Sequence, residues 1–443
     1  VSEKMYKRGE SFFMTVSWIG ALVGLALAII LILYRLNPVY ALMLGAVVGA
    51  IVGGANLTQT VNIVVTGSQS VMGTVMRVLA AGVLAGVMME SGAANTIARA
   101  IVDGLGERFA LLSLALSAMI ITQVGVFIAV TVIILAPIAL EVGERMHLSK
   151  LSLLVALSGG GKAGNIISPN PNTIAAAHGF NVELSQLMIA DFIPAVFGLI
   201  VTVLLATLVK NKGEITSEKD LDKLSATDQN VLPSLKTALV APIVAIVLLL
   251  INPIGNLLNI SLLIKFQVDA MYILPFAGIV GALAMGHGKK LLSYCSAGMA
   301  RMTDVVLILI GAGAIGGLIT SSDLPSQVVG LVQHSGISGV FLAPIAGILM
   351  AAATASTSTG VILATGSFSK SILAFGVSPI GAAVMVHTGA TVIDELPHGN
   401  YFHVTAASMH MSFKQRMQTI PYEALVGLTM TIVGTIMYGM ILK

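Results

Sequence analysis

The stretch Ser158-Gly-Gly-Gly-Lys162-Ala-Gly-Asn165-Ile-Ile-Ser168-Pro-Asn170-Pro-Asn172-Thr173 interrupts a strongly apolar chain. Its three consecutive glycines and two prolines are poor helix formers, so we expect no regular helix to run through it. The asparagine and threonine side chains, together with backbone amides and carbonyls freed from helical hydrogen bonds, would make a cradle for a polar ligand. An ordinary surface loop is the alternative interpretation. The surroundings of the stretch bear on this choice.

The composition of the whole chain places this stretch inside a membrane protein. Of its 443 residues, 56% are hydrophobic and 10% are charged, whereas soluble proteins carry roughly 25% charged residues. Hydrophobic runs of about 20 residues recur, as a membrane-spanning helix requires. Examples are residues 12–33, 187–209 and 424–442. The alternating runs of about 10 residues that form a membrane β-barrel are missing from the sequence. The sequence therefore predicts an all-α polytopic membrane protein.

Charge, cysteine content and motifs exclude several classes of protein. The formal net charge is +3 and the basic residues lie in short flanks, so we expect no nucleic-acid partner. The single cysteine, Cys295, rules out an intramolecular disulfide framework and a cysteine-based metal cluster, and we predict neither a metal site nor a cofactor. Because motifs of zinc proteases, serine hydrolases and P-loop ATPases are missing, we predict neither an enzyme nor an ATP-driven pump. The first apolar run is too long for a signal peptide, and we expect it to be retained.

A polar segment divides the chain into two hydrophobic halves. Residues 210–235 are predicted to be a cytoplasmic linker between a first membrane repeat, residues 1–209, and a second, residues 236–443. The halves show weak internal similarity in a shared order. Residues 81–91 align with 312–322, residues 123–125 with 354–356, and residues 158–173 with 387–402. This order predicts a duplication, a common way to build transporters, but it leaves open whether the repeats are inverted or parallel.

The alignment pairs four polar interruptions. The first lies around Gln123 in an apolar run, residues 110–140, that is too long for one perpendicular span; it predicts a strongly tilted helix, or a re-entrant hairpin joined to a spanning helix. The second is the stretch from 158 to 173, the third is residues 354–360, and the fourth is residues 387–400. Interrupted segments at matching positions of two repeats typically meet at a substrate, and broken backbone at membrane depth requires a buried or watery site.

The predicted substrate-binding residues come from the first three interruptions. Packing is the alternative interpretation, because Ser and Thr in membrane helices often bond to their own backbone and small residues permit close helix contact. The set is Gln123, Gly125, Lys162, Asn165, Ser168, Asn170, Asn172, Thr173, Thr354, Ser356, Thr357, Ser358 and Thr359.

Charged and titratable side chains in apolar surroundings supply the candidates for ion coupling. Lys162 would attract a carboxylate or extend to an interface. Asp394 and Glu395 would bind a proton or cation, or lie in a solvated loop. His387 and His398 are candidate proton carriers because imidazole titrates near neutral pH, although a structural role is the alternative for each.

The order of these motifs resembles the gluconate permease family, the gluconate:proton symporters of the ion transporter superfamily. The resemblance is carried by Gln123-Val-Gly-Val-Phe127, by Ser168-Pro-Asn-Pro-Asn-Thr173, by Gly360 and by residues 394–402. Gluconate permeases have Tyr-Glu-Val-Gly-Phe and Pro-Pro-His-Pro-Gly-Pro-Thr at the places of the first two. The resemblance implies two inverted repeats with re-entrant hairpins and broken transmembrane helices. It also implies proton-coupled uptake of sugar acids across a bacterial inner membrane, often by a homodimer.

Two departures from that family pattern affect the predicted coupling. Gln123 stands where the permeases have glutamate, and Asn170 stands where they have histidine, so two titratable groups are missing. The Asn and Thr clusters offer neutral oxygens that suit small cations, and they are similar to motifs of sodium-coupled dicarboxylate carriers. From the resemblance we nevertheless expect cation-coupled symport of a small hydroxylated organic acid such as gluconate, with the proton as the first choice of cation. The alternatives are a sodium-coupled carboxylate transporter and, more remotely, a channel.

Overall fold

The computed structural model describes residues 16–106, 109–217, 220, 232–266, 268–335 and 338–442. The described residues form helices and no β-strand, which confirms the all-α prediction. Residues 12–15 of the first predicted span, and most of the predicted linker between 218 and 231, lie outside the described residues.

The first half contains eleven described helices. They are α2 (Trp18–Leu33), α3 (Pro38–Val52), α4 (Leu57–Ser70), α5 (Met72–Glu90), α6 (Ala93–Leu105), α7 (Ala110–Gln123), α8 (Ile128–Arg145), α9 (Lys150–Ile166), α10 (Pro171–Gly179), α11 (Leu184–Ala190) and α12 (Phe192–Leu208).

The second half is built in a similar order. Its described elements are α14 (Leu235–Ala238), α15 (Val240–Leu258), α16 (Ser261–Ile264), α17 (Ala270–Ala284), η2 (Gly288–Lys290), α18 (Leu291–Thr320), α19 (Leu324–Ser335), η3 (Gly339–Phe341), α20 (Leu342–Thr354), α21 (Thr357–Ala374), α22 (Pro379–Gly389), α23 (Asn400–Ser408), α24 (Phe413–Met417), α25 (Ile420–Thr435) and the π-helical turn η4 (Ile436–Ile441). The seven described α-helices from α6 to α12 are matched in number by the seven from α19 to α25. That the two halves are repeats stays a prediction. An inverted orientation of the two halves stays a prediction.

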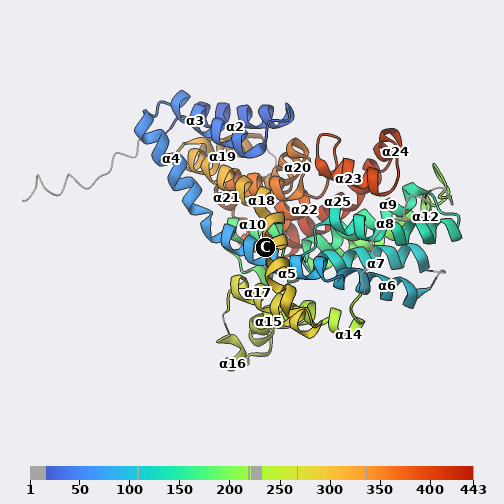
Figure 1. Cartoon of the computed structure of the whole chain (residues 1–443). Helices are drawn as coiled ribbons and strands as arrows, with labels where there is room; N and C mark the ends of the chain where they lie inside the picture. The colour runs from blue at the N-terminus through green and yellow to red at the C-terminus, as the bar shows by residue number, and fades with distance from the viewer. Residues whose placement is uncertain are drawn as a thin grey trace, which may run out of the picture.

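Helices of the two halves pack against one another. Helix α10 of the first half packs against α21 of the second, and α23 of the second packs against α8 of the first. Two further contacts join the halves, because α12 packs on α25 and α5 packs on α18. Figure 1 shows α18 beside α5 near the middle of the molecule, with α7, α8, α9 and α12 gathered on one side. The breaks of both halves are thereby brought together.

Helix length and composition fit a multi-pass membrane protein. Four described helical segments are long and apolar enough to cross a membrane, and α11 with α12 makes a fifth if this pair, bent by 43°, is one span. Five more apolar helices of 10–17 residues are shorter. On α12 the outward residues Ile200, Leu204 and Leu208 are 49%, 58% and 71% exposed, although all three are aliphatic. Such a face suits lipid rather than water.

The glycine triplet does not break its helix, and here the sequence-based expectation is wrong. Helix α9 continues without interruption through Gly159, Gly160 and Gly161. A Cβ atom on Gly160 would overlap the carbonyl oxygen of Ala115 on α7, and one on Gly159 would overlap Thr202 on α12. The glycines therefore let two neighbouring helices approach α9 closely, as small residues do in membrane proteins. The helix ends only at Ile166, before the two prolines.

The other interruptions do separate helices. Helix α7 ends at Gln123 and α8 begins at Ile128, with Gly125 between them at a φ of +97° that favours glycine. The long run is thus two helices rather than one tilted helix. Helices α20 and α21 are separated by Ala355 and Ser356, and α22 and α23 by residues 390–399.

The described part of the linker is held against the membrane domain. The Nζ atom of Lys150, at the start of α9, lies 2.6 Å from a carboxylate oxygen of Glu214 and 2.7 Å from one of Asp220. The hydrogen bond from Lys150 lowers the pKa of the Glu214 carboxyl below its ordinary value. The linker is therefore anchored near its beginning rather than wholly solvated.

Candidate functional site

Four helices that follow a break begin at one cavity of about 740 Å³. They are α8 and α10 from the first half and α21 and α23 from the second. The N-terminus of a helix carries a partial positive charge and unpaired backbone N–H groups, so it favours anions. Converging N-termini therefore make this cavity a candidate site for an anion such as a carboxylate.

The backbone amides at the four helix starts are not equally available. At α10 the Asn170 side chain accepts from the amides of Asn172 and Thr173, so this helix is capped by its own chain. At α21 the Ser356 side chain accepts only from Thr359. Within the described part of the chain, the N–H groups of Thr357 and Ser358 have no hydrogen-bond partner. Helix α21 thus offers the cavity unpaired donors, which α10 does not.

Nine of the predicted residues line the cavity. They supply amide, hydroxyl, carboxyl and imidazole groups, which suit a substrate that carries hydroxyls as well as a carboxylate. The nine are Asn165, Asn172, Thr354, Ser356, Thr357, Ser358, Thr359, Asp394 and His398.

Sequence reasoning missed several other lining residues. Arg35 and Asn37, in the turn between α2 and α3, and Arg301 on α18 bring two positive charges to the cavity. Arg35 is exposed, whereas Arg301 is paired with Glu90 at 2.7 Å. Asn400, Tyr401 and His403 add polar atoms from α23. The signal for Arg35 was its position as a lone basic residue between two apolar runs.

Eight predicted residues do not line this cavity. Asn170 donates its amide N–H to the carbonyl and side-chain oxygens of Asn165, at 2.7 and 2.6 Å, and Thr173 bonds within the same loop. These two residues shape the break rather than the cavity surface. The eight are Gln123, Gly125, Lys162, Ser168, Asn170, Thr173, Glu395 and His387.

Lys162 is fully buried in a cluster that joins the halves. Its Nζ atom lies 2.7 Å from Asp394 Oδ1 and 3.0 Å from Glu395 Oε2, and it donates to the Thr391 carbonyl oxygen at 2.6 Å. The hydroxyl of Thr357, at the start of α21, donates to the other carboxylate oxygen of Asp394. Of the charged groups in the cluster, Asp394 alone also lines the cavity.

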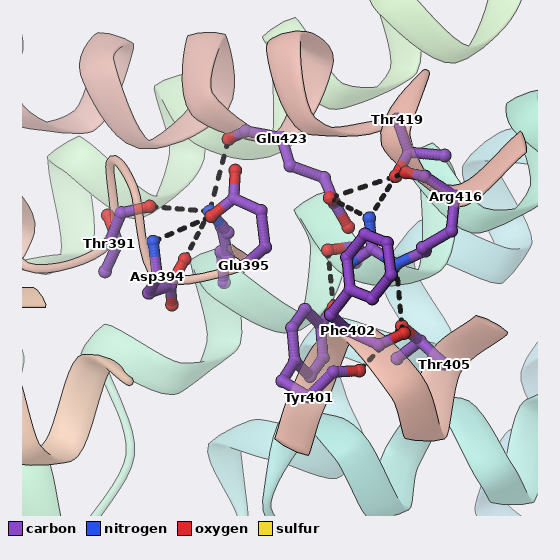
Figure 2. Close-up of polar contacts among 11 residues, drawn as sticks. Thr391, Asp394, Glu395, Tyr401, Phe402, Thr405, Arg416, Thr419 and Glu423 are labelled. Atoms are coloured by element: carbon purple, nitrogen blue, oxygen red, sulfur yellow. Dashed lines mark hydrogen bonds and ion pairs between the residues drawn. The ribbon is translucent and has the colours of Figure 1, made fainter. Parts of the chain in front are cut away.

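The buried charges extend from this cluster to Arg416. The side chain of Glu423 accepts from Arg416 at 2.6 Å (Figure 2). The backbone carbonyl of Glu423 accepts from Lys162 at 3.3 Å, so Glu423 bridges the two cations. The Arg416 guanidinium also lies 5.5 Å from the Tyr401 ring centroid and 5.1 Å from that of Phe402. Arg416 and Glu423 were not predicted from the sequence. Because these charges are buried, removal of one partner would leave the other uncompensated at a high cost in stability.

A second polar chain leads from Asp191 to the cavity. His387 Nδ1 lies 2.7 Å from Asp191 Oδ2, and His387 Nε2 lies 3.1 Å from the Asn172 amide nitrogen. The Ser358 hydroxyl then donates to the Asn172 oxygen at 3.2 Å. Asp191 and His387 are fully buried, whereas Asn172 and Ser358 line the cavity. Asp191 was missed, although a lone aspartate within an apolar run was a usable signal.

A second cavity, also of about 740 Å³, lies further along α10 and α21. Its lining includes Asn62 and Thr66 on α4, His178 on α10 and Thr365 on α21. The two cavities share one lining residue, Ile362. The first two turns of α21 thus face one cavity and its later turns face the other.

Comparison with known proteins assigns the chain to a family. The family model for GntP family permeases matches residues 14–441, nearly the whole chain. The chain belongs to the GntP permease family. This identification confirms the resemblance seen in the sequence and makes the protein a multi-pass membrane permease.

Relatives of this GntP family permease are also transporters. A transporter of Haemophilus influenzae is 49% identical and covers 96% of this chain and 99% of its own. The high-affinity gluconate transporter of Escherichia coli is 22% identical over 92% of this chain and 94% of its own. The D-serine transporter DsdX of Escherichia coli is 24% identical over 83% and 86%.

The fold also has a solved counterpart. The crystal structure of the Alcanivorax borkumensis YdaH transporter, described as having an unusual topology, matches with a TM-score of 0.63. It covers 87% of this chain and 90% of its own at 14% identity. At this identity the likeness establishes the fold alone.

Proposed function

We propose that this permease is a secondary active symporter that carries a small hydroxylated carboxylate together with a cation, the proton. The main support for this proposal is that four helix N-termini, two from each half, converge on one cavity lined by Asn, Ser and Thr side chains. The unpaired amides of Thr357 and Ser358 would bind the carboxylate. The side chains of Asn165, Asn172 and Thr354 would bind its hydroxyl groups.

The named substrates of two relatives support this substrate class. One relative is a gluconate transporter and another is a D-serine transporter. Both molecules carry a carboxylate and at least one hydroxyl group, although D-serine also carries an ammonium group. A cavity that combines amide donors with hydroxyls fits the part that the two molecules share. We propose the inner membrane of a bacterium as its location, since the relatives described above are bacterial, and a homodimer as its assembly.

The two cavities support a carrier over a channel. Both reach α10 and α21, but they share only Ile362 among their lining residues. Close packing of α10 on α21, where a Cβ atom on Gly179 would overlap Thr365, lies beside the second cavity. A carrier that exposes its site alternately to each side needs such a closed contact, whereas a channel needs a continuous pore.

Four side chains are proposed to bind the coupling cation. Asp394 and Glu395 are already paired with Lys162, so protonation of either would leave a buried ammonium group with less compensation. His398 lines the cavity, and His387 reaches it through Asn172. The two histidines are therefore the better proton sites on geometry.

Uptake into proteoliposomes tests the proposal. Gluconate, other sugar acids and D-serine would be supplied with a proton gradient or a sodium gradient imposed separately. We expect concentrative uptake of at least one hydroxylated carboxylate under the proton gradient, and counterflow of that substrate without any gradient. Accumulation driven only by sodium would establish the sodium-coupled alternative. Flux without counterflow would identify a channel and contradict the proposal.

A further inference from the structure

We propose that Asp191 and His387 form the proton site of this transporter and that Asn172 transmits its protonation to the substrate. The idea rests on the proposed function and adds to it a coupling device. Its basis is the chain of contacts from Asp191 through His387 and Asn172 to Ser358, which connects a fully buried pair with the cavity.

With neutral His387, the hydrogen bonds fix the orientation of the Asn172 amide. The Asp191 carboxylate only accepts, so the imidazole proton is on Nδ1, 2.7 Å from Asp191 Oδ2. His387 Nε2 is then an acceptor, and the NH₂ group of Asn172 donates to it. The amide oxygen of Asn172 points to Ser358, whose hydroxyl donates to it. In this state the hydroxyl proton of Ser358 is engaged by the Asn172 oxygen, and one N–H of Asn172 is engaged by His387 Nε2.

Protonation of His387 reverses these roles. A proton on Nε2 turns this atom into a donor, which cannot face the NH₂ group of Asn172. A half-turn of the amide places its oxygen against Nε2–H and its NH₂ group toward Ser358. The Ser358 oxygen can then accept from Asn172, which frees the hydroxyl proton to point into the cavity. One added proton thus turns the Asn172 amide around and makes the Ser358 hydroxyl a donor for a substrate oxygen.

Charge compensation favours this site for the proton. Asp191 Oδ1 is buried without a hydrogen-bond partner among the described residues, so with neutral His387 the pair carries one uncompensated negative charge. The proton makes the pair a neutral ion pair, which costs less in a low-dielectric interior. By linkage, whatever stabilises the bound anion also stabilises the proton. Substrate and proton therefore bind cooperatively, as symport requires.

Other titratable groups near the pair are already engaged. The Tyr438 hydroxyl, from η4, donates to the Ala190 carbonyl oxygen at 3.2 Å, next to Asp191. Four residues after His387, just beyond the end of α22, the Thr391 carbonyl accepts from Lys162. Lys162 is in turn paired with Asp394 and Glu395. From α25, Glu423 is paired with Arg416. Among the described residues, Asp191 is the one charged group in hydrogen-bond contact with His387.

The test measures substrate affinity against pH with no gradient present. The full-length protein in proteoliposomes would exchange radiolabelled gluconate, or D-serine if gluconate is not exchanged, at equal internal and external pH between about pH 5 and pH 8. For the native protein we expect the half-saturating concentration to fall about 5- to 150-fold as the pH falls. His387→Gln should abolish this dependence while exchange continues, and proton-driven accumulation should be lost. His334→Gln, at an exposed histidine on α19, is the matched control and should behave as the native protein.

A second variant tests the proposal even if His387→Gln does not fold. Asp191→Asn keeps the shape of the side chain but removes the charge that stabilises the imidazolium, so the pH dependence of the affinity should weaken or vanish. If either folded variant keeps both the native pH dependence and proton-driven accumulation, the inference is wrong. Failure of the proposed function looks different, because the native protein itself would then exchange no carboxylate at any pH.

Discussion

The Nζ atom of Lys162, on α9 of the first half, lies 2.7 Å from Oδ1 of Asp394 in the break after α22 of the second half. Lys162 is fully buried and Asp394 nearly so. The contact ties the cavity to the protein interior, because Asp394 also lines the cavity and accepts from Thr357 at the start of α21. The break is therefore positioned by a buried charge pair and not by loop conformation alone.

Removal of the buried ammonium group should destabilise the protein strongly. In Lys162→Met the carboxylates of Asp394 and Glu395 lose their shared cation, and we expect a loss of about 3–5 kcal/mol. Thermal unfolding in detergent would measure it. The double variant Lys162→Met, Glu395→Gln should lose less stability than the two single variants lose together. The interaction between the two side chains is counted twice when the single losses are added. Strict additivity would show that the pair is not coupled.

A methyl group at Gly160 should disrupt the packing of α7 on α9. The added Cβ atom of Gly160→Ala would overlap a backbone oxygen that cannot move without displacing α7, so folded yield and thermal stability should both fall. Gly330→Ala, in the middle of α19, is the control because no atom lies within 4 Å of its added Cβ atom. That variant should gain stability, by about 0.5–1 kcal/mol, from helix propensity. Equal effects of the two substitutions would contradict the packing role.

Polar side chains in the cavity should affect binding more than polar side chains in the adjoining loop. Asn172→Ala and Ser358→Ala each remove a side chain that would hydrogen-bond a substrate oxygen, worth about 0.5–1.5 kcal/mol, or roughly 2- to 10-fold in half-saturating concentration. Thr173→Ala removes a hydroxyl that bonds within the loop and should leave affinity nearly unchanged. Counterflow kinetics at fixed pH would compare the three. An affinity loss confined to Thr173→Ala would place the site elsewhere.

Arg35 should attract anionic substrates to the cavity. It is exposed and lines the cavity, so Arg35→Gln should raise the half-saturating concentration of gluconate at low ionic strength. The effect should shrink as salt screens the charge, and it should be small for D-serine, which has no net charge. Arg99→Gln, at an exposed arginine of α6 outside the lining of both cavities, is the control. A salt-independent loss for both substrates would indicate a structural role instead.

The sequence predicted the breaks because their causes are local. Prolines near Asn170, and Ser356 with its threonine neighbours, are typical of helix starts, and the structure begins α10 and α21 there. The nearly constant offset in the alignment of the two halves paired each break of the first half with one of the second. The glycines of α9 show the limit of this reasoning, since low helix propensity was overridden by close packing against α7 and α12.

The partners of buried charges could not be predicted in the same way. Asp191 meets His387, and Glu423 meets both Arg416 and Lys162, through the packing of helices that are distant in sequence. A single sequence contains no signal for such pairing. It indicates only that a charge in an apolar run needs a partner. Lys162 was predicted to bind substrate, but its ammonium group is paired with Asp394 and Glu395.

The late position of Asp394 and Glu395 in the chain has a consequence for biogenesis. The ribosome delivers α9 to the membrane before either acid has been synthesised, so Lys162 is then a lone ammonium group, which hydrocarbon disfavours. Nascent chains truncated before Asp394 should therefore leave α9 within reach of water, and a membrane-impermeant maleimide would label cysteines introduced along it. Insertion of the first half would thus be completed only when its C-terminal counterpart leaves the ribosome.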